Sequence, residues 1–142
     1  MGPHAVPGEP ASALEARLGH PTAVYPLPEG QEWEYATGPF GQRTWMARIG
    51  ADGRVRGFEQ VLTSARFAAI EIDHARKADV LRIVGHPAET SRVMQHNYEV
   101  WSYRYKESDV WNSMMHVHFD QDGVVRMMLN GPDRMFDHER FR

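Results

Sequence analysis

Hydrophobic and polar residues alternate along several short stretches of the chain, and this pattern predicts half-buried β-strands. The stretches predicted as strands are residues 32–35, 43–49, 54–62, 98–105, 112–120 and 123–130. Helical spacing of apolar residues predicts short helices ahead of each set of strands. The residues that mark the apolar sides of these helices are Leu14, Leu18, Phe67, Ile70, Val80, Leu81 and Val84. The chain is therefore predicted to run from helix to strands twice.

Local signals predict where the helices begin and end. Ser12 and Glu15 have the spacing of a capping box, in which side chain and backbone satisfy each other at a helix start. Gly19 with Pro21 is predicted to end the first helix, because proline cannot continue it. The residues predicted to cap the helical pieces of the second half are Thr63, Ser64 and Asp73.

Three short motifs occur twice and in the same order along the chain. They are Gly-His-Pro at 19–21 and 85–87, Trp-x-Tyr at 33–35 and 101–103, and Asp-Gly at 52–53 and 122–123. The spacing between the two copies grows in small steps, as small loop insertions would cause. Such repetition predicts two copies of one structural unit.

The predicted fold class is α+β, built as a tandem duplication. Each copy is a helix, or two helices, followed by a three-stranded antiparallel meander, with the helices on one face of the sheet. The two Asp-Gly pairs are predicted to form the hairpin turns between the second and third strands. The predicted organisation is a flexible leader at 1–11, a first repeat at 12–62, a second repeat at 63–130 and a C-terminal tail at 131–142.

The composition is that of an ordinary globular protein, with 42% hydrophobic and 25% charged residues in a chain of 142. A net charge of -3 gives no basic footprint for nucleic acid. The sequence has no apolar run of the roughly 20 residues that cross a bilayer, and no signal-peptide pattern. The lack of cysteine excludes disulfides, thiolate catalysis and cysteine-ligated zinc.

No motif for catalysis or for a cofactor is found in the sequence, so we expect a protein that is not an enzyme. Residues 120–123, Asp-Gln-Asp-Gly, resemble the start of a calcium loop. Residues 50–53 of the first copy keep only the Asp-Gly pair, which is what a hairpin turn needs. The turn interpretation is therefore favoured over a calcium site.

Two histidines, His116 and His118, are the strongest candidates for a ligand site. Because they are two residues apart on a predicted strand, their side chains lie on the same face and could bind one metal ion. No third ligand is evident nearby in the sequence. The favoured interpretation is a solvated strand face, with Met115, Val117 and Phe119 facing the helices.

Aromatic residues on the predicted strands have two interpretations. They are Trp33, Tyr35, Trp45, Trp101, Tyr103 and Tyr105. Aromatic residues at alternating positions are usually core residues. If their face of the sheet is open, the same residues become anchors of a protein interface, because such interfaces are enriched in Tyr and Trp. Together with His116 and His118 they form the candidate protein interface.

The repeated order of elements resembles the small outer-membrane lipoproteins of the BamE/SmpA/OmlA type. Two copies in one chain are also similar to the tandem architecture of beta-lactamase inhibitor protein. The residues that carry the resemblance are Gly19, Pro21, Trp33, Tyr35, Asp52, Gly53, Gly85, Pro87, Trp101, Tyr103, Asp122 and Gly123. The resemblance implies an α+β fold in the cell envelope, at the outer membrane or in the periplasm, and protein partners in place of a substrate. The lipid anchor that it implies has no lipobox cysteine in this chain.

Three functions follow from these observations. The first is a non-enzymatic, lipoprotein-like accessory protein that binds other envelope proteins, with a role in outer-membrane protein assembly. The second is a secreted or periplasmic binding module that inhibits an enzyme, as beta-lactamase inhibitor protein does. The third is a metal-binding or small-ligand-binding protein that uses the two histidines.

Overall fold

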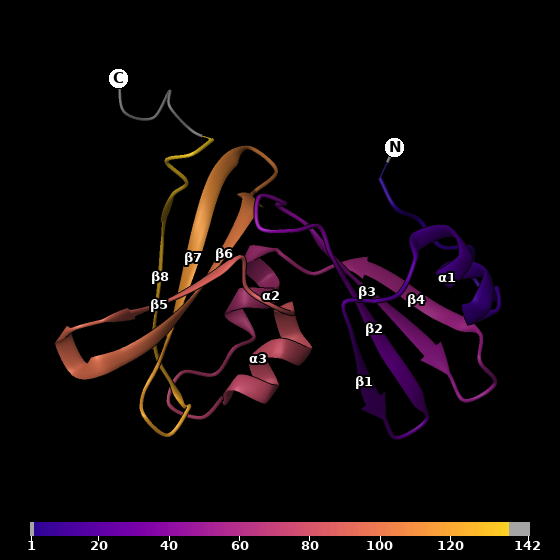
Figure 1. Cartoon of the computed structure of the whole chain (residues 1–142), viewed down its shortest axis with the longest axis horizontal. Coiled ribbons are helices and arrows are strands. Elements are labelled where there is room, and N and C mark those ends of the chain that lie inside the picture. Colours follow the sequence, from indigo (N-terminus) through magenta and orange to yellow (C-terminus); the bar gives the residue numbers. More distant parts are fainter. Residues whose placement is uncertain (1, 137–142) are drawn as a thin grey trace. The chain divides into compact units, whose positions relative to one another are not determined.

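The computed structural model describes residues 2–136 and divides the chain into two compact units. Unit 1 contains the residues up to Ala36 together with Thr44–Gln60, and unit 2 contains Thr37–Arg43 and the residues from Val61 onward. Each unit has its own four-stranded antiparallel sheet (Figure 1). None of the helices in this described part is long and apolar enough to span a membrane.

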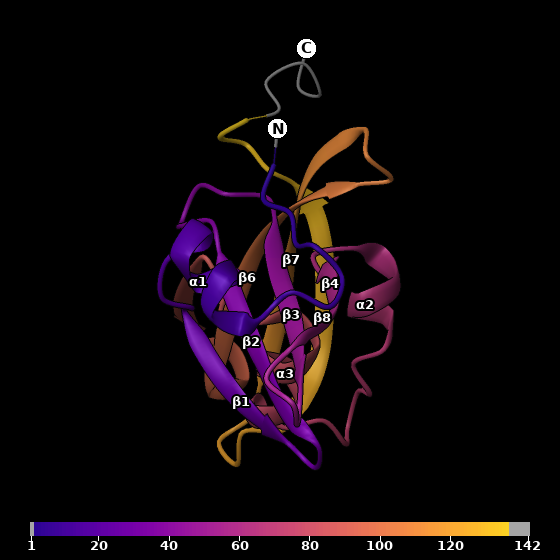
Figure 2. The same cartoon turned by 90° about the vertical axis from the view of Figure 1, so that its right-hand side faces the viewer.

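Unit 1 consists of a sheet with the strand order β1-β2-β3-β4 and one helix, which covers one face of that sheet (Figure 2). Its elements are α1 (Ala11–Leu18), β1 (Ala23–Leu27), β2 (Gly30–Ala36), β3 (Thr44–Gly50) and β4 (Val55–Gln60). Leu14 of α1 is fully buried and belongs to one apolar cluster with Tyr35, Ala47, Ile49 and Val55 of the sheet. Burying one such leucine contributes about 1.5 to 3 kcal/mol, so this contact is what fixes α1 to the sheet.

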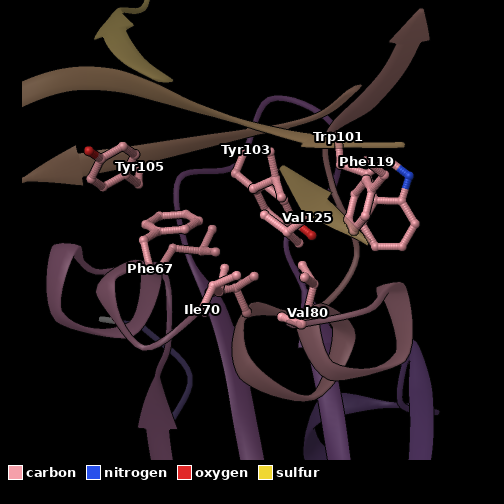
Figure 3. Packing of buried hydrophobic residues seen from close by; sticks show 12 residues of the cluster. Phe67, Ile70, Val80, Trp101, Tyr103, Tyr105, Phe119 and Val125 are labelled. Carbon is pink, nitrogen blue, oxygen red and sulfur yellow. The ribbon is translucent and has the colours of Figure 1, made fainter. Parts of the chain in front are cut away.

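Unit 2 has a longer sheet, in the order β5-β6-β7-β8, and two helices. Its elements are α2 (Ser64–Ala68), α3 (Lys77–Val84), β5 (Glu89–Val93), the 3-10 turn η1 (Gln95–Asn97), β6 (Tyr98–Glu107), β7 (Trp111–Phe119) and β8 (Val125–Pro132). In Figure 3, Phe67 of α2 and Val80 of α3 face the side chains of the sheet. The Phe67 ring meets Tyr103 and Tyr105 edge to face, with centroids 5.6 and 5.0 Å away.

The predicted helix starts can be compared directly with the structure. Thr63 caps α2 as predicted, because its side-chain oxygen accepts a hydrogen bond from the Arg66 backbone N–H at 3.1 Å. The prediction for Ser12 is wrong. The first helix already begins at Ala11, so Ser12 lies inside it and caps nothing.

The predicted cap at Asp73 is also wrong. The third helix begins at Lys77, and there the Asp79 carboxylate accepts a hydrogen bond from the Arg76 N–H at 2.9 Å. Asp73 lies before the helix in the left-handed region, with φ of 74°. Aspartate tolerates this conformation better than most residues, so Asp73 serves a turn instead of a cap.

The predicted fold class is wrong in its repeating unit, because each sheet has four strands and not three. The missed strands, β1 and β5, are both edge strands. β1 contains Pro26, which an edge strand tolerates because one side of its backbone needs no partner. β5 is exposed at four of its five positions, so it has no alternating pattern of apolar residues. Neither strand therefore has the alternation of hydrophobic and polar residues from which the other strands were predicted.

The repeated motifs nevertheless occupy equivalent places in the two units. Gly19 ends α1 with φ of 84°, and Gly85 ends α3 with φ of 79°. The hydroxyl of Tyr35 donates to the Gly19 carbonyl at 3.0 Å, and that of Tyr103 donates to the Gly85 carbonyl at 2.8 Å. In both units, the tyrosine of the Trp-x-Tyr strand thus binds the end of a helix to the sheet.

The Asp-Gly turns also match, and they lie between the strands for which they were predicted. Gly53 and Gly123 have φ of 76° and 79°, a conformation that glycine adopts without strain. After each turn the strand register skips one residue, Arg56 in β4 and Arg126 in β8. Such a bulge increases the local twist of the strands.

The segment ahead of α1, predicted as a flexible leader, is hydrogen-bonded to unit 1. The Gly8 N–H donates to the Val55 carbonyl at 2.9 Å, and the Val55 N–H donates to the Glu9 carbonyl at 2.8 Å. Glu9 also forms an ion pair with Arg17 of α1 at 2.7 Å. The hydrogen bonds of its carboxylate to Arg17 and to the Val6 N–H lower the pKa of Glu9 to about 2.

Candidate functional site

The aromatic residues considered for an interface lie on the faces that the helices cover. Tyr35, Trp101, Tyr103 and Tyr105 are buried members of the two apolar clusters. Trp33 and Trp45 are half-buried and pack against the core of unit 1. Trp45 stacks on Phe58 with ring centroids 5.0 Å apart. All six side chains stabilise the two units, and four of them are buried.

The opposite face of the unit 2 sheet carries the two histidines. We call it the histidine face and define it by the side chains that alternate with the core positions: Tyr98, Val100, Ser102, Arg104, Asn112, Met114, His116 and His118. His118 is only 7% exposed and His116 is half-buried, so the expected solvated histidines are largely withdrawn from water. As expected, Met115, Val117 and Phe119 lie on the helix side.

His116 is hydrogen-bonded to Ser102, with 2.7 Å between its Nδ1 and the Ser102 Oγ. This distance also suits a nucleophile and its base, and sequence reasoning did not find the pair. Ser102 is buried, however, and the burial of His116 lowers its pKa while the charge of Glu89 acts in the opposite direction. The geometry therefore describes a polar contact inside the sheet, with a hydroxyl that is closed to a substrate.

His118 has no such partner among residues 2–136. Its Nδ1 is buried there without a hydrogen bond, and its ring is nearly perpendicular to that of Tyr98, with the ring centroids 6.4 Å apart. Burial lowers the pKa of His118, and the neighbouring His116 lowers it further. Within residues 2–136, no three His, Cys, Asp or Glu side chains are arranged to hold a metal ion.

At one end of the histidine face, Arg104 is the centre of a buried ion pair. Its Nη1 lies 2.6 Å from both carboxylate oxygens of Asp133, and its Nε donates to the Pro39 carbonyl at 3.0 Å. Arg104 is 6% exposed and Asp133 is 1% exposed. Because buried charges are costly unless they are paired and hydrogen-bonded, this geometry holds the guanidinium in one orientation.

Two phenylalanine rings lie against this guanidinium. The Arg104 Cζ is 5.9 Å from the ring centroid of Phe40 and 5.5 Å from that of Phe136, both within range of a cation–π interaction. The rings themselves are exposed, by 60% for Phe40 and 40% for Phe136. We call the group of Phe40, Arg104, Asp133 and Phe136 the aromatic clamp.

A second set of hydrogen bonds holds the same segments together. The Asn112 side chain accepts from the Gln42 amide at 2.8 Å and donates to the Phe136 carbonyl at 3.1 Å. The Asn112 carbonyl accepts from the Asp133 N–H at 2.9 Å. The loop that carries Phe40 and the segment that carries Phe136 are thus both bonded to β7, so the two rings are held in place by the backbone beneath them.

Sequence reasoning did not identify the aromatic clamp. Phe40 lies in the sequence Gly-Pro-Phe-Gly at 38–41, between two predicted strands. Asp133 and Phe136 lie in the predicted C-terminal tail, where no helix or strand was predicted. An aromatic residue inside a turn of glycine and proline was the one available signal, because such turns are usually solvent-exposed.

Comparisons with known proteins show little similarity. The chain matches no protein-family model. It matches no curated protein either. One solved structure, a "putative beta-lactamase inhibitor protein" from Streptococcus mutans, is similar over 90% of this chain and 85% of that one, with 11% sequence identity and a TM-score of 0.37. A match at this level is too weak to support an argument about fold or function. The comparisons include no match to lipoproteins of the BamE/SmpA/OmlA type.

Proposed function

We propose that this chain is a non-catalytic protein-binding module whose binding surface is the aromatic clamp of unit 2. The observation that carries the proposal is the pair of exposed phenylalanine rings that lie against a buried, ion-paired guanidinium. Folding gains nothing from the part of each ring that stays in water, since the hydrophobic term scales with the area that is buried. Burial against a partner would recover that term.

The support beneath the rings favours binding in a second way. A surface side chain that must be immobilised on association costs about 0.5 to 1.5 kcal/mol of binding free energy. Phe40 and Phe136 are already oriented by Arg104 and by the hydrogen bonds of Asn112, so much of this cost is absent. Preorganised aromatic anchors of this kind are typical of the few residues that dominate a protein interface.

The partner expected from this chemistry is a protein with an apolar recess for the two rings. The buried carboxylate of Asp133 neutralises Arg104, so the clamp presents aromatic surface and no free charge. A location in the cell envelope, as the sequence resemblance implies, stays a prediction. Fractionation of the native cell with an antibody against the chain is the measurement that checks it.

Site-specific crosslinking is the first experiment. A photoreactive phenylalanine analogue in place of Phe40 or Phe136 is expected to crosslink one and the same protein in an envelope preparation from the native cell. The matched control places the analogue at Ile72, an exposed apolar residue of unit 2 outside the clamp. A protein captured equally well from position 72 would not be a partner of the clamp.

The purified partner then allows a quantitative test. The double variant Phe40→Ala/Phe136→Ala is expected to weaken binding at least about thirtyfold, because truncating a central aromatic anchor costs about 2 kcal/mol or more. Ile72→Ala is expected to leave the Kd unchanged. An unchanged Kd in the double variant, with circular dichroism showing a folded chain, would disprove the proposal.

A further inference from the structure

Unit 1 contains a hollow of about 640 Å³ between its two hairpin turns. It is lined by Leu27, Pro28, Glu29, Arg48, Gly50, Ala51, Asp52 and Arg56, which come from the β1–β2 turn, the end of β3, the β3–β4 turn and β4. We call it the glycine hollow. Every lining residue belongs to unit 1, so the hollow is a feature of that unit alone.

Two paired glycines belong to this end of the sheet. Gly50 lines the hollow, and its register partner in the β2–β3 pair is Gly30. A Cβ on Gly30 would lie 1.9 Å from the Ile49 carbonyl oxygen, and one on Gly50 would lie 2.8 Å from the Arg56 Nε. A side chain at Gly30 would therefore clash with the backbone, and one at Gly50 would displace the Arg56 side chain that lines the hollow.

Four charged side chains line the hollow: two form an ion pair with each other, and two do not. Arg56 and Asp52 form an ion pair at 2.5 Å and so neutralise each other. Arg48 extends over Gly57, with its Nη2 3.1 Å from the place of a Cβ there. Among the described residues, neither Arg48 nor Glu29 forms an ion pair or a side-chain hydrogen bond, with each other or with any other group.

The third property of the lining is apolar surface. Leu27 is half-buried, and Pro28 and Ala51 are exposed, so all three can still be covered by a ligand. A ligand that matches the whole lining needs a carboxylate for Arg48, an ammonium for Glu29 and an apolar group for Leu27, Pro28 and Ala51. A volume of about 640 Å³ leaves ample room for a molecule of this size.

We propose that the glycine hollow binds a small zwitterion with an apolar side chain, of the class of the free aliphatic amino acids. The guanidinium of Arg48 binds the carboxylate, a pairing for which arginine geometry is suited. Glu29 binds the ammonium, and the apolar residues contact the side chain. The contacts are exposed to water, where a single charge pair contributes little, so we expect weak binding.

The experiment uses the full chain and three probes that share one apolar side chain and differ in which charged groups they carry. Leucine carries both charged groups, 4-methylpentanoate lacks the ammonium, and 3-methylbutylamine lacks the carboxylate. Each is titrated while the backbone amide signals of Gly30, Gly50 and Ala51 are followed by NMR. Leucine is expected to shift these signals at lower concentration than either analogue does.

Two variants assign the charges. Arg48→Gln and Glu29→Gln are each expected to weaken leucine binding about three- to fivefold, which is the effect of removing one exposed charge contact. Only Arg48→Gln should weaken the binding of 4-methylpentanoate. The matched control is Arg43→Gln, which removes an exposed arginine of unit 2 and should change none of the affinities.

Three results would overturn the proposal. The first is the absence of localised shifts with millimolar leucine. The second is an unchanged leucine affinity in either Arg48→Gln or Glu29→Gln. The third is a carboxylate analogue that binds as tightly as leucine, because the ammonium would then have no role.

Discussion

At the scale of single residues, the histidine face of unit 2 shows how burial determines the protonation of the histidines. Ser102 provides His116 with a hydrogen-bond partner, while the Nδ1 of His118 is buried without one in the described part of the chain. An uncompensated buried polar atom costs free energy, and a buried positive charge at the same place costs more. The neutral form of His118 is therefore the form that the fold requires.

This requirement predicts how stability depends on pH. Burial and the nearby His116 lower the pKa of His118 below its ordinary value of 6.5 in the folded chain. As the pH falls below about 6.5, the unfolded chain binds a proton that the folded chain excludes. The free energy of unfolding is therefore expected to decrease from above pH 7 down to the lowered folded pKa, below which the loss is complete.

The variant His118→Phe tests this prediction, because it removes the titrating group and keeps a planar ring. Chemical denaturation at a series of pH values should give a smaller slope of unfolding free energy against pH than in the parent chain. His116, whose pKa is also lowered, contributes to the slope that remains. A comparison at pH 8, where the imidazoles are neutral, measures the packing change separately. An unchanged slope would contradict the assignment to His118.

At the scale of elements, each unit joins a helix end to its sheet in the same way. The tyrosine of the Trp-x-Tyr strand donates its hydroxyl to the carbonyl of the glycine that ends the helix. Carbonyls in the last turn of a helix have no partner within the helix, so this bond satisfies a group that would otherwise need water. The same chemistry therefore closes α1 in unit 1 and α3 in unit 2.

The matched substitutions Tyr35→Phe and Tyr103→Phe compare the two bonds. Each removes only the hydroxyl, and we expect a loss of about 1 to 3 kcal/mol for Tyr103, whose buried hydrogen bond leaves the Gly85 carbonyl unsatisfied. A smaller loss is expected for Tyr35, because its bond is only partly buried and water can replace the hydroxyl. Unfolding free energies from urea titrations measure both. A larger effect at Tyr35 would contradict this order.

Comparison with the sequence predictions shows which elements carry their own signal. The strands with alternating burial, the glycine helix ends and the Asp-Gly turns depend on residues close in sequence, and these features were predicted. The edge strands β1 and β5 are defined by pairing with a neighbour, and β5 pairs through polar, exposed residues. A strand of that kind can be recognised only from its partner, so the three-stranded unit was predicted in error.

The candidate site was hidden for a related reason. Its residues come from three separate places in the sequence. Arg104 lies within β6, Asp133 follows β8, and Phe40 lies in a turn. Nothing in the local pattern at any one of them indicates the other two. The histidines were noticed because two ligands on one strand form a local pattern, but their burial depends on the surrounding sheet.

At the scale of the whole molecule, one segment of the chain belongs to a different unit from the residues on either side of it in sequence. The segment Thr37–Arg43 lies between β2 and β3 of unit 1 in sequence, yet it belongs to unit 2. Arg104 binds it through the Pro39 carbonyl and the Phe40 ring, and Gln42 binds Asn112. The buried pair with Asp133 keeps Arg104 in the orientation that these contacts need.

Removing one partner of this pair should therefore affect both stability and the position of Phe40. Asp133→Ala leaves the buried Arg104 uncompensated, and we expect a loss of about 3 to 5 kcal/mol of unfolding free energy. The double variant Arg104→Met/Asp133→Leu removes both charges and should recover most of that loss, because apolar side chains of similar volume can replace a buried ion pair.

Urea titrations give the stability, and a fluorine-labelled Phe40 reports by NMR whether its ring stays fixed. In both variants the ring is expected to become mobile, because neither retains the oriented guanidinium on which it rests. A loss below about 1 kcal/mol in Asp133→Ala, with an immobile Phe40 ring, would show that other contacts hold the segment and that the ion pair does not organise the aromatic clamp.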